Sequence, residues 1–164
     1  YRHAVTPTIT APTIMGDIDK VRAQIESIIG YSDVVKASSD DLELLYPGMS
    51  IEAILTRWGT LGPTLTVATR AADGVSFRLT TTGEFVTLAA PPTRVVDTVG
   101  AGDSFMAGLL SGLSSAGLIG SAEARDRLHR STIGDVTPAI QRGSRCGAIT
   151  VSHAGAYAPS LDEL

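Results

Sequence analysis

The chain has 164 residues, 43% of them apolar and 18% charged, which is enough apolar material for a packed core and too little charge for a disordered chain. Its formal net charge of −4 argues against nucleic acid or a membrane surface as the main partner. A single cysteine, Cys146, excludes an internal disulfide, and no apolar run reaches the ~20 residues that span a bilayer, so we expect a cytoplasmic protein.

The start of the chain shows neither a hydrophobic period nor the basic start and apolar core of a signal peptide. It begins with Tyr1 and is rich in threonine and proline. We interpret residues 1–13 as an irregular or aberrant lead-in and residues 14–164 as the folded domain.

Helical and extended patterns alternate after the lead-in. Apolar residues at helical spacing predict a first helix, which Gly30 ends, and a β-branched run predicts a buried parallel strand. Ser38 and Ser50 have the residue type and position of N-caps for the two helices that follow. The predicted helices span residues 18–29, 39–46 and 51–58, and the predicted strand spans residues 33–37.

The second half continues this alternation. A turn at residues 72–74 separates one strand from two more, which we expect to pair antiparallel around a Thr-Thr-Gly turn. Pro138 suits the first turn of a final helix with Thr137 as its N-cap. The predicted strands span residues 65–69, 75–79 and 84–88, and the predicted helices span residues 104–115, 121–130 and 138–151. Strands separated by helices imply an α/β layered domain with a parallel sheet.

The residues that indicate chemistry form the string Asp-Thr-Val-Gly-Ala-Gly-Asp-Ser-Phe at residues 97–105. Gly100, Ala101 and Gly102 place backbone N–H groups at a helix N-terminus with almost no side-chain bulk, which favours an anion site for a phosphoryl group. The carboxylate of Asp103 beside such a site is explained if Asp103 is a general base for a substrate hydroxyl. The alternative is that Asp103 only N-caps the helix and that the glycines form a tight turn.

This string matches the pattern D-T-x-G-A-G-D-x-F, and it resembles the second signature of the ribokinase-like sugar kinases, the PfkB carbohydrate kinase family. The resemblance extends over residues 14–164 and is greatest to bacterial fructokinases, through the runs at residues 33–42, 46–48 and 146–156. It implies a three-layer α/β domain with a mostly parallel central sheet, of which this chain resembles the carboxy-terminal, nucleotide-binding half. It also implies an ATP-dependent phosphotransferase that acts on a primary sugar hydroxyl.

The resemblance implies a role for each matching position of the signature. Asp103 would be the catalytic base, and the Gly-Ala-Gly run at residues 100–102 would form the anion hole for the γ-phosphoryl group. Asp97 and Thr98 would support the signature. Asp97 also lies where some relatives bind a monovalent cation.

The resemblance places the nucleotide at two further segments. It assigns a nucleotide loop, at a strand end where α/β sheets usually receive ligands, to Thr69, Arg70, Ala71, Asp73 and Gly74. By its position in the final helix, Ser144 would line the adenine pocket. The family normally has glycine where this chain has Ala71. If that position needs a positive φ, Ala71 would strain the loop or narrow the approach of the phosphates.

The family's Asn-x-x-Glu motif, which is tied to magnesium and phosphate, falls on Ser38-x-x-Asp41 in this chain. The acidic end is kept but shortened, and the amide is lost. Asp41 is therefore a candidate for a water-mediated contact to Mg²⁺. The alternative is that Asp41 is an acid in the first turn of a helix.

The family's sugar-contacting residues, its β lid and its first Gly-Gly signature have no counterpart in this sequence. A truncation or frameshift ahead of Ile14 would explain both the lead-in and the family match that follows it. We expect ATP and Mg²⁺ as cofactors, a sugar as substrate, and a homodimer through the lid in a full-length protein. We expect the isolated chain to be marginally stable or to associate. The alternative function is a truncated, catalytically inactive nucleotide-binding remnant.

A more remote alternative is a serine esterase. Ser104 in its Gly-Asp-Ser string and the Asp126-x-x-His129 spacing resemble two sequence blocks of a serine esterase family. A triad of Ser104, His129 and Asp126 would be chemically sensible. Short matches of this kind have a high false-positive rate, and Asp126 and His129 also fit a solvated helix face.

Overall fold

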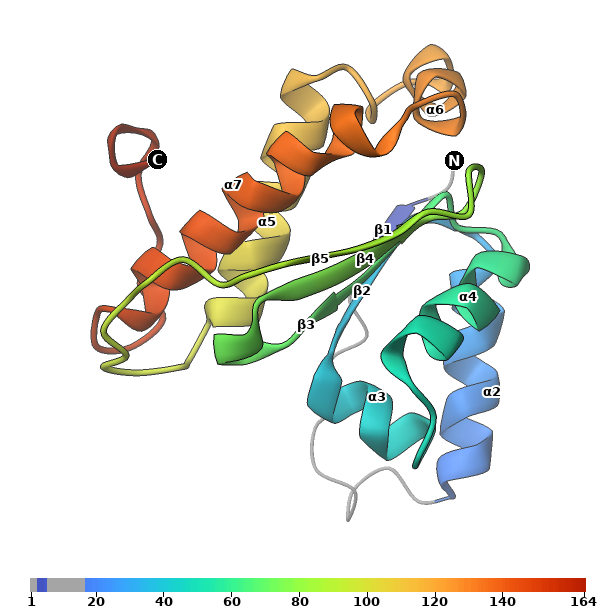
Figure 1. The fold of residues 1–164 in the computed structure, drawn as a ribbon, viewed down its shortest axis with the longest axis horizontal. Coiled ribbons are helices and arrows are strands. Elements are labelled where there is room, and N and C mark those ends of the chain that lie inside the picture. The colour runs from blue at the N-terminus through green and yellow to red at the C-terminus, as the bar shows by residue number, and fades with distance from the viewer. Residues whose placement is uncertain (1–2, 6–16) are drawn as a thin grey trace. The chain divides into compact units, whose positions relative to one another are not determined.

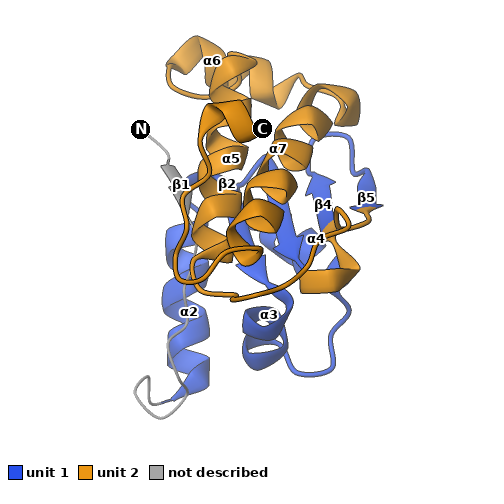
Figure 2. Cartoon of the chain, turned by 90° about the vertical axis from the view of Figure 1, so that its left-hand side faces the viewer, with its two compact units in different colours: residues 1–70, 76–87 blue, residues 71–75, 88–164 orange. Residues whose placement is uncertain are grey.

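The structure is a computed structural model that describes residues 3–5 and 17–164. The chain divides into two compact units, and each is described by itself. Unit 1 comprises residues 1–70 and 76–87, and unit 2 comprises residues 71–75 and 88–164 (Figure 2).

Unit 1 holds most of a mixed five-stranded sheet with the order β1-β2-β3-β4-β5 (Figure 1). The strands are β1 (His3–Val5), β2 (Ser32–Ser38), β3 (Leu65–Thr69), β4 (Val75–Leu79) and β5 (Phe85–Leu88). β1, β2 and β3 run parallel, and Ser38 at the end of β2 lies opposite Thr69 at the end of β3. β4 and β5 are hydrogen-bonded neighbours joined by a turn of residues 80–84, and so short a connection requires antiparallel strands.

β1 lies inside the segment that we interpreted as an irregular lead-in. Its residues pair in parallel with β2, with Ala4 opposite Val34 and Val5 opposite Val35. This pairing gives the backbone groups of residues 3–5 partners in the sheet. Residues 6–13 of the expected lead-in, and Ile14 after them, lie outside the described residues.

Three helices of unit 1 follow the predicted bounds closely. They are α2 (Ile18–Ile29), α3 (Ser39–Leu45) and α4 (Ile51–Leu61). Gly30 ends α2, and the side chains of Ser38 and Ser50 cap α3 and α4 as predicted. α4 runs three residues beyond the predicted end at Trp58, up to Gly62, whose φ of 139° stops the helix.

The core of unit 1 lies between these helices and one face of the sheet. Trp58, Leu45 and Ile54 are buried there against Val35 and Ala37 of β2. Val35 and Ala37 both belong to this core because side chains alternate along β2, so that residues 35 and 37 point to the same side of the sheet.

A polar network at the edge of this core joins α2, α4 and the residue that follows α3. The Tyr46 hydroxyl donates to Glu26 Oε1 over 2.6 Å and accepts from Trp58 Nε1 over 2.8 Å. Arg57 donates to both oxygens of Glu26, over 2.7 and 3.1 Å. Burial raises the pKa of Tyr46 to about 12, and the hydrogen bond from Arg57 lowers the pKa of Glu26. At neutral pH the network therefore consists of a neutral phenol donor and a charged carboxylate acceptor.

Unit 2 consists mainly of the helices α5 (Ala101–Ser115), α6 (Ala122–His129) and α7 (Ile133–Val151). α5 and α7 lie side by side in both views (Figures 1 and 2). Glycines line their contact: a Cβ on Gly108 would lie 2.6 Å from the Cys146 Sγ, and one on Gly143 would lie 2.8 Å from the Phe105 carbonyl oxygen. The two backbones therefore approach closely, which places the first turn of α5 accurately against α7.

α5 begins at Ala101, three residues before the predicted start at Ser104. The cause is Gly100, which adopts a left-handed conformation (φ 78°, ψ −3°) as the N-cap, so the residues after it are already helical. The functional string therefore supplies the first turn of the helix as well as the turn before it.

α7 also begins earlier than predicted, at Ile133 rather than Pro138. Its N-cap is Thr132 and not Thr137, because Thr132 and Asp135 form a capping box that starts the helix. Pro138 lies in the second turn, where a proline removes one helical hydrogen bond. The capping box outweighed the proline as a start signal.

The described residues include no helix that is long and apolar enough to cross a membrane.

Candidate active site

The turn before α5 requires a glycine at residue 100 for two reasons. Its φ of 78° lies in the left-handed region, which side-chain-bearing residues rarely adopt. A Cβ at this position would also lie 3.0 Å from the Cβ of Ala156. Residue 100 must be a glycine for both reasons, and the second shows that the turn packs closely against the segment that follows α7.

The first turn of α5 leaves backbone donors open. Among the described residues, no hydrogen bond uses the N–H of Gly100, Gly102 or Asp103. The N–H of Ala101 donates to the Thr98 carbonyl over 3.3 Å, so one of the three amides that we predicted for the anion hole is already engaged. The open amides lie at the positive end of the helix dipole, which favours an anion.

Asp103 lies in this first turn with its side chain exposed. The N-cap is Gly100, and Asp103 makes no capping hydrogen bond, so the alternative that Asp103 only N-caps α5 is wrong. No hydrogen bond or ion pair within the described residues engages its carboxylate. The carboxylate is thus free to accept a proton from a bound hydroxyl group.

Asp97 fastens the start of the turn to a distant segment. Its Oδ1 accepts the N–H of Val99 over 3.0 Å, and its Oδ2 accepts the N–H of Gly155 over 2.8 Å. These two backbone hydrogen bonds hold the pKa of Asp97 below its ordinary value, and the hydrogen bond from Val99 contributes most. Sequence reasoning missed Gly155, because no local pattern shows that a residue 58 positions away binds this carboxylate.

The predicted nucleotide loop follows β3 and contains a short 3₁₀ helix over Ala71–Asp73. The boundary between the two units falls between Arg70 and Ala71. Ala71 has a φ of 47°, and in the described part of the chain it is the one non-glycine residue with a positive φ. The position does adopt the conformation for which we expected strain, at a cost of about 1–2 kcal/mol for a residue with a Cβ.

Ser38 and Asp41 form the capping box of α3. Asp41 Oδ2 accepts from the Ser38 N–H over 3.1 Å and from the Ser38 hydroxyl over 2.7 Å, while the Asp41 N–H donates to Ser38 Oγ. This geometry is that of the alternative in which Asp41 is an acid in the first turn of α3. Ser38, which this carboxylate contacts, ends β2 and lies opposite Thr69 at the end of β3. Among the described residues, no group of three or more His, Cys, Asp or Glu side chains could by itself hold a metal ion.

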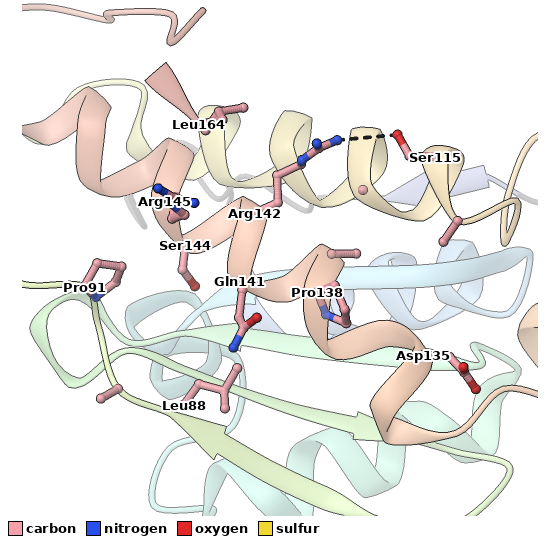
Figure 3. A pocket seen from close by; sticks show the side chains of 14 residues that line it. Leu88, Pro91, Ser115, Asp135, Pro138, Gln141, Arg142, Ser144, Arg145 and Leu164 are labelled. Atoms are coloured by element: carbon pink, nitrogen blue, oxygen red, sulfur yellow. Dashed lines mark hydrogen bonds between the residues drawn. The ribbon is translucent and has the colours of Figure 1, made fainter. Parts of the chain in front are cut away.

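Ser144 lines a cavity of about 900 Å³ in unit 2 (Figure 3). Ser144 and Gln141 lie on the side of α7 that faces Leu88 and Pro91. Arg142 extends to the other side, where it donates to the hydroxyl groups of Ser111 and Ser115 on α5. Ser144 thus lines a cavity large enough for a nucleobase. Gln141 also lines this cavity, and no sequence signal pointed to it.

The structure does not assemble the esterase triad. Ser104 lies in the first turn of α5, where its Oγ is 2.7 Å from Thr150 Oγ1. Asp126 and His129 belong to α6, which follows the other end of α5. From Ser104 to the end of α5 the helix rises by about 16 Å, so these residues do not meet.

The sequence profile of the family described as "pfkB family carbohydrate kinase" matches residues 2–163. The chain belongs to this family. The matched range also includes most of the residues that we interpreted as a lead-in.

The chain is similar in sequence and in structure to several kinases of this family. A fructokinase of Rhizobium leguminosarum bv. trifolii is 35% identical over 108 residues, which cover 66% of this chain and 32% of the relative. The crystal structure of aminoimidazole riboside kinase from Salmonella enterica, complexed with aminoimidazole riboside and an ATP analog, superposes with a TM-score of 0.71 at 26% identity. That match covers 93% of this chain and 46% of the other.

The ribokinase of Thermotoga maritima superposes with a TM-score of 0.70 at 21% identity, over 98% of this chain and 46% of the ribokinase. The expected ribokinase-like α/β fold is therefore confirmed. The chain spans between 28% and 48% of the lengths of the curated relatives compared with it.

Proposed function

We propose that this chain carries the ATP-binding and phosphoryl-transfer part of a sugar kinase, which moves the γ-phosphoryl group of ATP to a primary sugar hydroxyl. The observation that carries the proposal is the open N-terminus of α5, where unengaged amides of residues 100, 102 and 103 lie beside the exposed carboxylate of Asp103. Family membership supplies the reaction class.

In this proposal the Asp103 carboxylate and the open backbone amides have separate roles. The Asp103 carboxylate accepts the proton of the sugar hydroxyl as its oxygen attacks the γ-phosphorus atom and the bond to the β-phosphate oxygen breaks. The backbone amides and the helix dipole stabilise the negative charge on the phosphoryl oxygens. Neither group has to break an existing bond within the chain to do so.

The nucleotide would lie on the remaining predicted residues. The loop residues Thr69, Arg70, Ala71, Asp73 and Gly74 would contact the nucleotide, and the cavity lined by Ser144 and Gln141 would receive the adenine. The cavity has apolar and amide groups on α7 and on the segment after β5, which suits a planar base with polar edges.

Two ions belong to the proposal. When bound, Mg²⁺ would neutralise charge on the ATP phosphates. Asp41 stays the proposed residue for a water-mediated contact to this ion, through its Oδ1 atom, which the capping box leaves open. A monovalent cation at Asp97 would have to share the carboxylate with the N–H groups of Val99 and Gly155. A carboxylate has lone pairs enough for both.

The proposed acceptor is fructose or a related sugar, because curated fructokinases are among the relatives. The presence of an aminoimidazole riboside kinase among the relatives makes ribosides the second class to test.

The experiment is titration of the chain with ATP and Mg²⁺ by calorimetry, followed by measurement of ADP release with fructose and a panel of ketoses and nucleosides. We expect Asp103→Asn to lower turnover by at least about 10²-fold while ATP binding changes little, because the variant loses the proton acceptor and keeps the amides. Asp126→Asn on α6 is the matched control and should leave both unchanged.

Each outcome has a meaning. Turnover of Asp103→Asn within a few-fold of the unmodified chain would show that Asp103 is not the base. Binding of ATP without turnover would support the inactive nucleotide-binding alternative. An unmodified chain that does not bind ATP would contradict the proposal.

A further inference from the structure

A buried hydroxyl group is one of the links between the first turn of α5 and the rest of unit 2. Thr150, near the end of α7, is fully buried, and its Oγ1 lies 2.7 Å from the Oγ of Ser104 and 2.9 Å from the carbonyl oxygen of Tyr157. Ser104 Oγ itself lies 3.4 Å from that carbonyl oxygen. Three oxygen atoms from α5, α7 and the segment after α7 thus share two hydroxyl hydrogens.

The carbonyl acceptor in this group is itself held in place. The Tyr157 ring stacks on His153 with ring centroids 3.9 Å apart and an interplanar angle of 12°. The Tyr157 hydroxyl donates to Glu163, and its N–H donates to the Gly155 carbonyl over 2.8 Å. Thr150 therefore links Ser104 to a carbonyl group whose own residue, Tyr157, is held by several contacts.

Ser104 directly follows Asp103, and its N–H makes the first hydrogen bond of α5, to the Gly100 carbonyl over 2.9 Å. Any rotation of this turn about the helix axis moves the Asp103 carboxylate and the open amides together. The close glycine contacts between α5 and α7 set the distance between the helices. Arg142 of α7 donates to Ser111 further along α5. At the first turn of α5 the directional contact is the one between Thr150 and Ser104. Because hydrogen bonds are directional, the contact at Ser104 restricts the rotation of this turn.

We propose that Thr150 is a positioning residue that, through Ser104, sets the orientation of the open amides and of the Asp103 carboxylate. The inference deepens the proposed function and rests on it. It predicts that the hydroxyl group of residue 150 matters for ligand binding at a site that Thr150 does not touch.

The test compares two substitutions at one position. Thr150→Val keeps the shape and removes the hydroxyl group, and Thr150→Ser keeps the hydroxyl group and removes a methyl. We expect Thr150→Val to weaken binding of ATP with Mg²⁺ by about tenfold or more and to shift the ¹H–¹⁵N resonances of Gly102 and Asp103. Thr150→Ser should restore both to within about threefold and to near the original shifts.

Thr66→Val is the matched control. Thr66 is also fully buried, and its hydroxyl donates to the Leu55 carbonyl over 3.3 Å within unit 1. This variant should lose stability as Thr150→Val does, without a change in ATP binding or in the two amide resonances. Should Thr150→Val fail to fold, Ser104→Ala removes the other end of the same hydrogen bond.

The outcomes separate the two proposals. If the unmodified chain binds ATP and Thr150→Val binds it equally well, Thr150 is not a positioning residue. If the unmodified chain does not bind ATP, the proposed function fails. The amide resonances then decide about Thr150, because unchanged Gly102 and Asp103 shifts in Thr150→Val would overturn the inference.

Discussion

Gly100 and Ala71 each set the backbone conformation of a predicted phosphate-binding segment, but only Gly100 suits the conformation that it adopts. Gly100 has the positive φ that its position needs at no steric cost. Ala71 has a positive φ of 47° as well, but its Cβ comes close to the backbone in this conformation. The turn before α5 is therefore relaxed at its tightest point, whereas the nucleotide loop is strained.

Replacing Ala71 by glycine should relieve that strain. We expect Ala71→Gly to raise the free energy of unfolding by about 1 kcal/mol, because the relief exceeds the entropy that a glycine adds to the unfolded chain. In a chain of this size that corresponds to a rise in Tm of about 2–4 °C in thermal unfolding.

Ala72→Gly is the matched control, since Ala72 lies in the same 3₁₀ helix without a positive φ. It should lower the stability by about 0.5–1 kcal/mol through the entropy of the unfolded chain alone. A fall in Tm for both variants would contradict a strained Ala71.

At the scale of elements, α2, α3 and α4 are joined by a polar contact that depends on pH. Glu26 on α2 accepts hydrogen bonds from Arg57 on α4 and from Tyr46 at the end of α3. Its pKa in the folded chain is lowered from 4.5, chiefly by the hydrogen bond from Arg57. The stability that this carboxylate contributes is therefore present above pH 4.5 and is lost as the pH falls through the lowered pKa.

Glu26→Gln should lower the free energy of unfolding at pH 7 by about 1 kcal/mol, because a partly exposed ion pair and a charged acceptor are lost. The difference from the unmodified chain should shrink at a pH below the lowered pKa of Glu26, where Glu26 itself is neutral in the folded chain. Urea unfolding at both pH values measures this. Glu84→Gln, in the exposed turn before β5, should show no difference at either pH, and a pH-independent effect of Glu26→Gln would refute the role of its charge.

At the scale of the whole molecule, exposed apolar side chains suggest self-association. Val95, Val96 and Val99 flank the turn before α5 and are 55–61% exposed, and Tyr31 is 75% exposed. The sheet also ends in edge strands β1 and β5, whose outer backbone groups can pair with another chain.

We expect sedimentation velocity to show an average mass that rises above 17.0 kDa with concentration. The double substitution Val95→Ser and Val96→Ser should reduce this rise, because it removes two of the three exposed valines beside the turn. A single species at the monomer mass over the whole concentration range would contradict the expectation.

Much of the fold could be predicted because its signals are local. Gly30, Ser38 and Ser50 act within one turn of helix, so the bounds of α2 and α3 and the start of α4 follow from a few neighbouring residues. The starts of α5 and α7 were predicted too late, because the sequence pattern pointed to Ser104 and Pro138. The helices begin instead after a left-handed Gly100 and at a capping box formed by Thr132.

The string from Asp97 to Phe105 indicated the family because it resembles a long signature of the PfkB carbohydrate kinases, and the profile match over residues 2–163 confirms the family. Its glycine-rich helix start with an adjacent carboxylate fits phosphoryl transfer, but by itself it left helix capping open. Only the tertiary structure decided which amides stay open and what holds them. Those answers depend on Thr150, Gly155 and Tyr157, which meet the string only after α7 has packed against α5. Contacts between residues so far apart in sequence leave no local pattern, since packing alone brings them within hydrogen-bond distance.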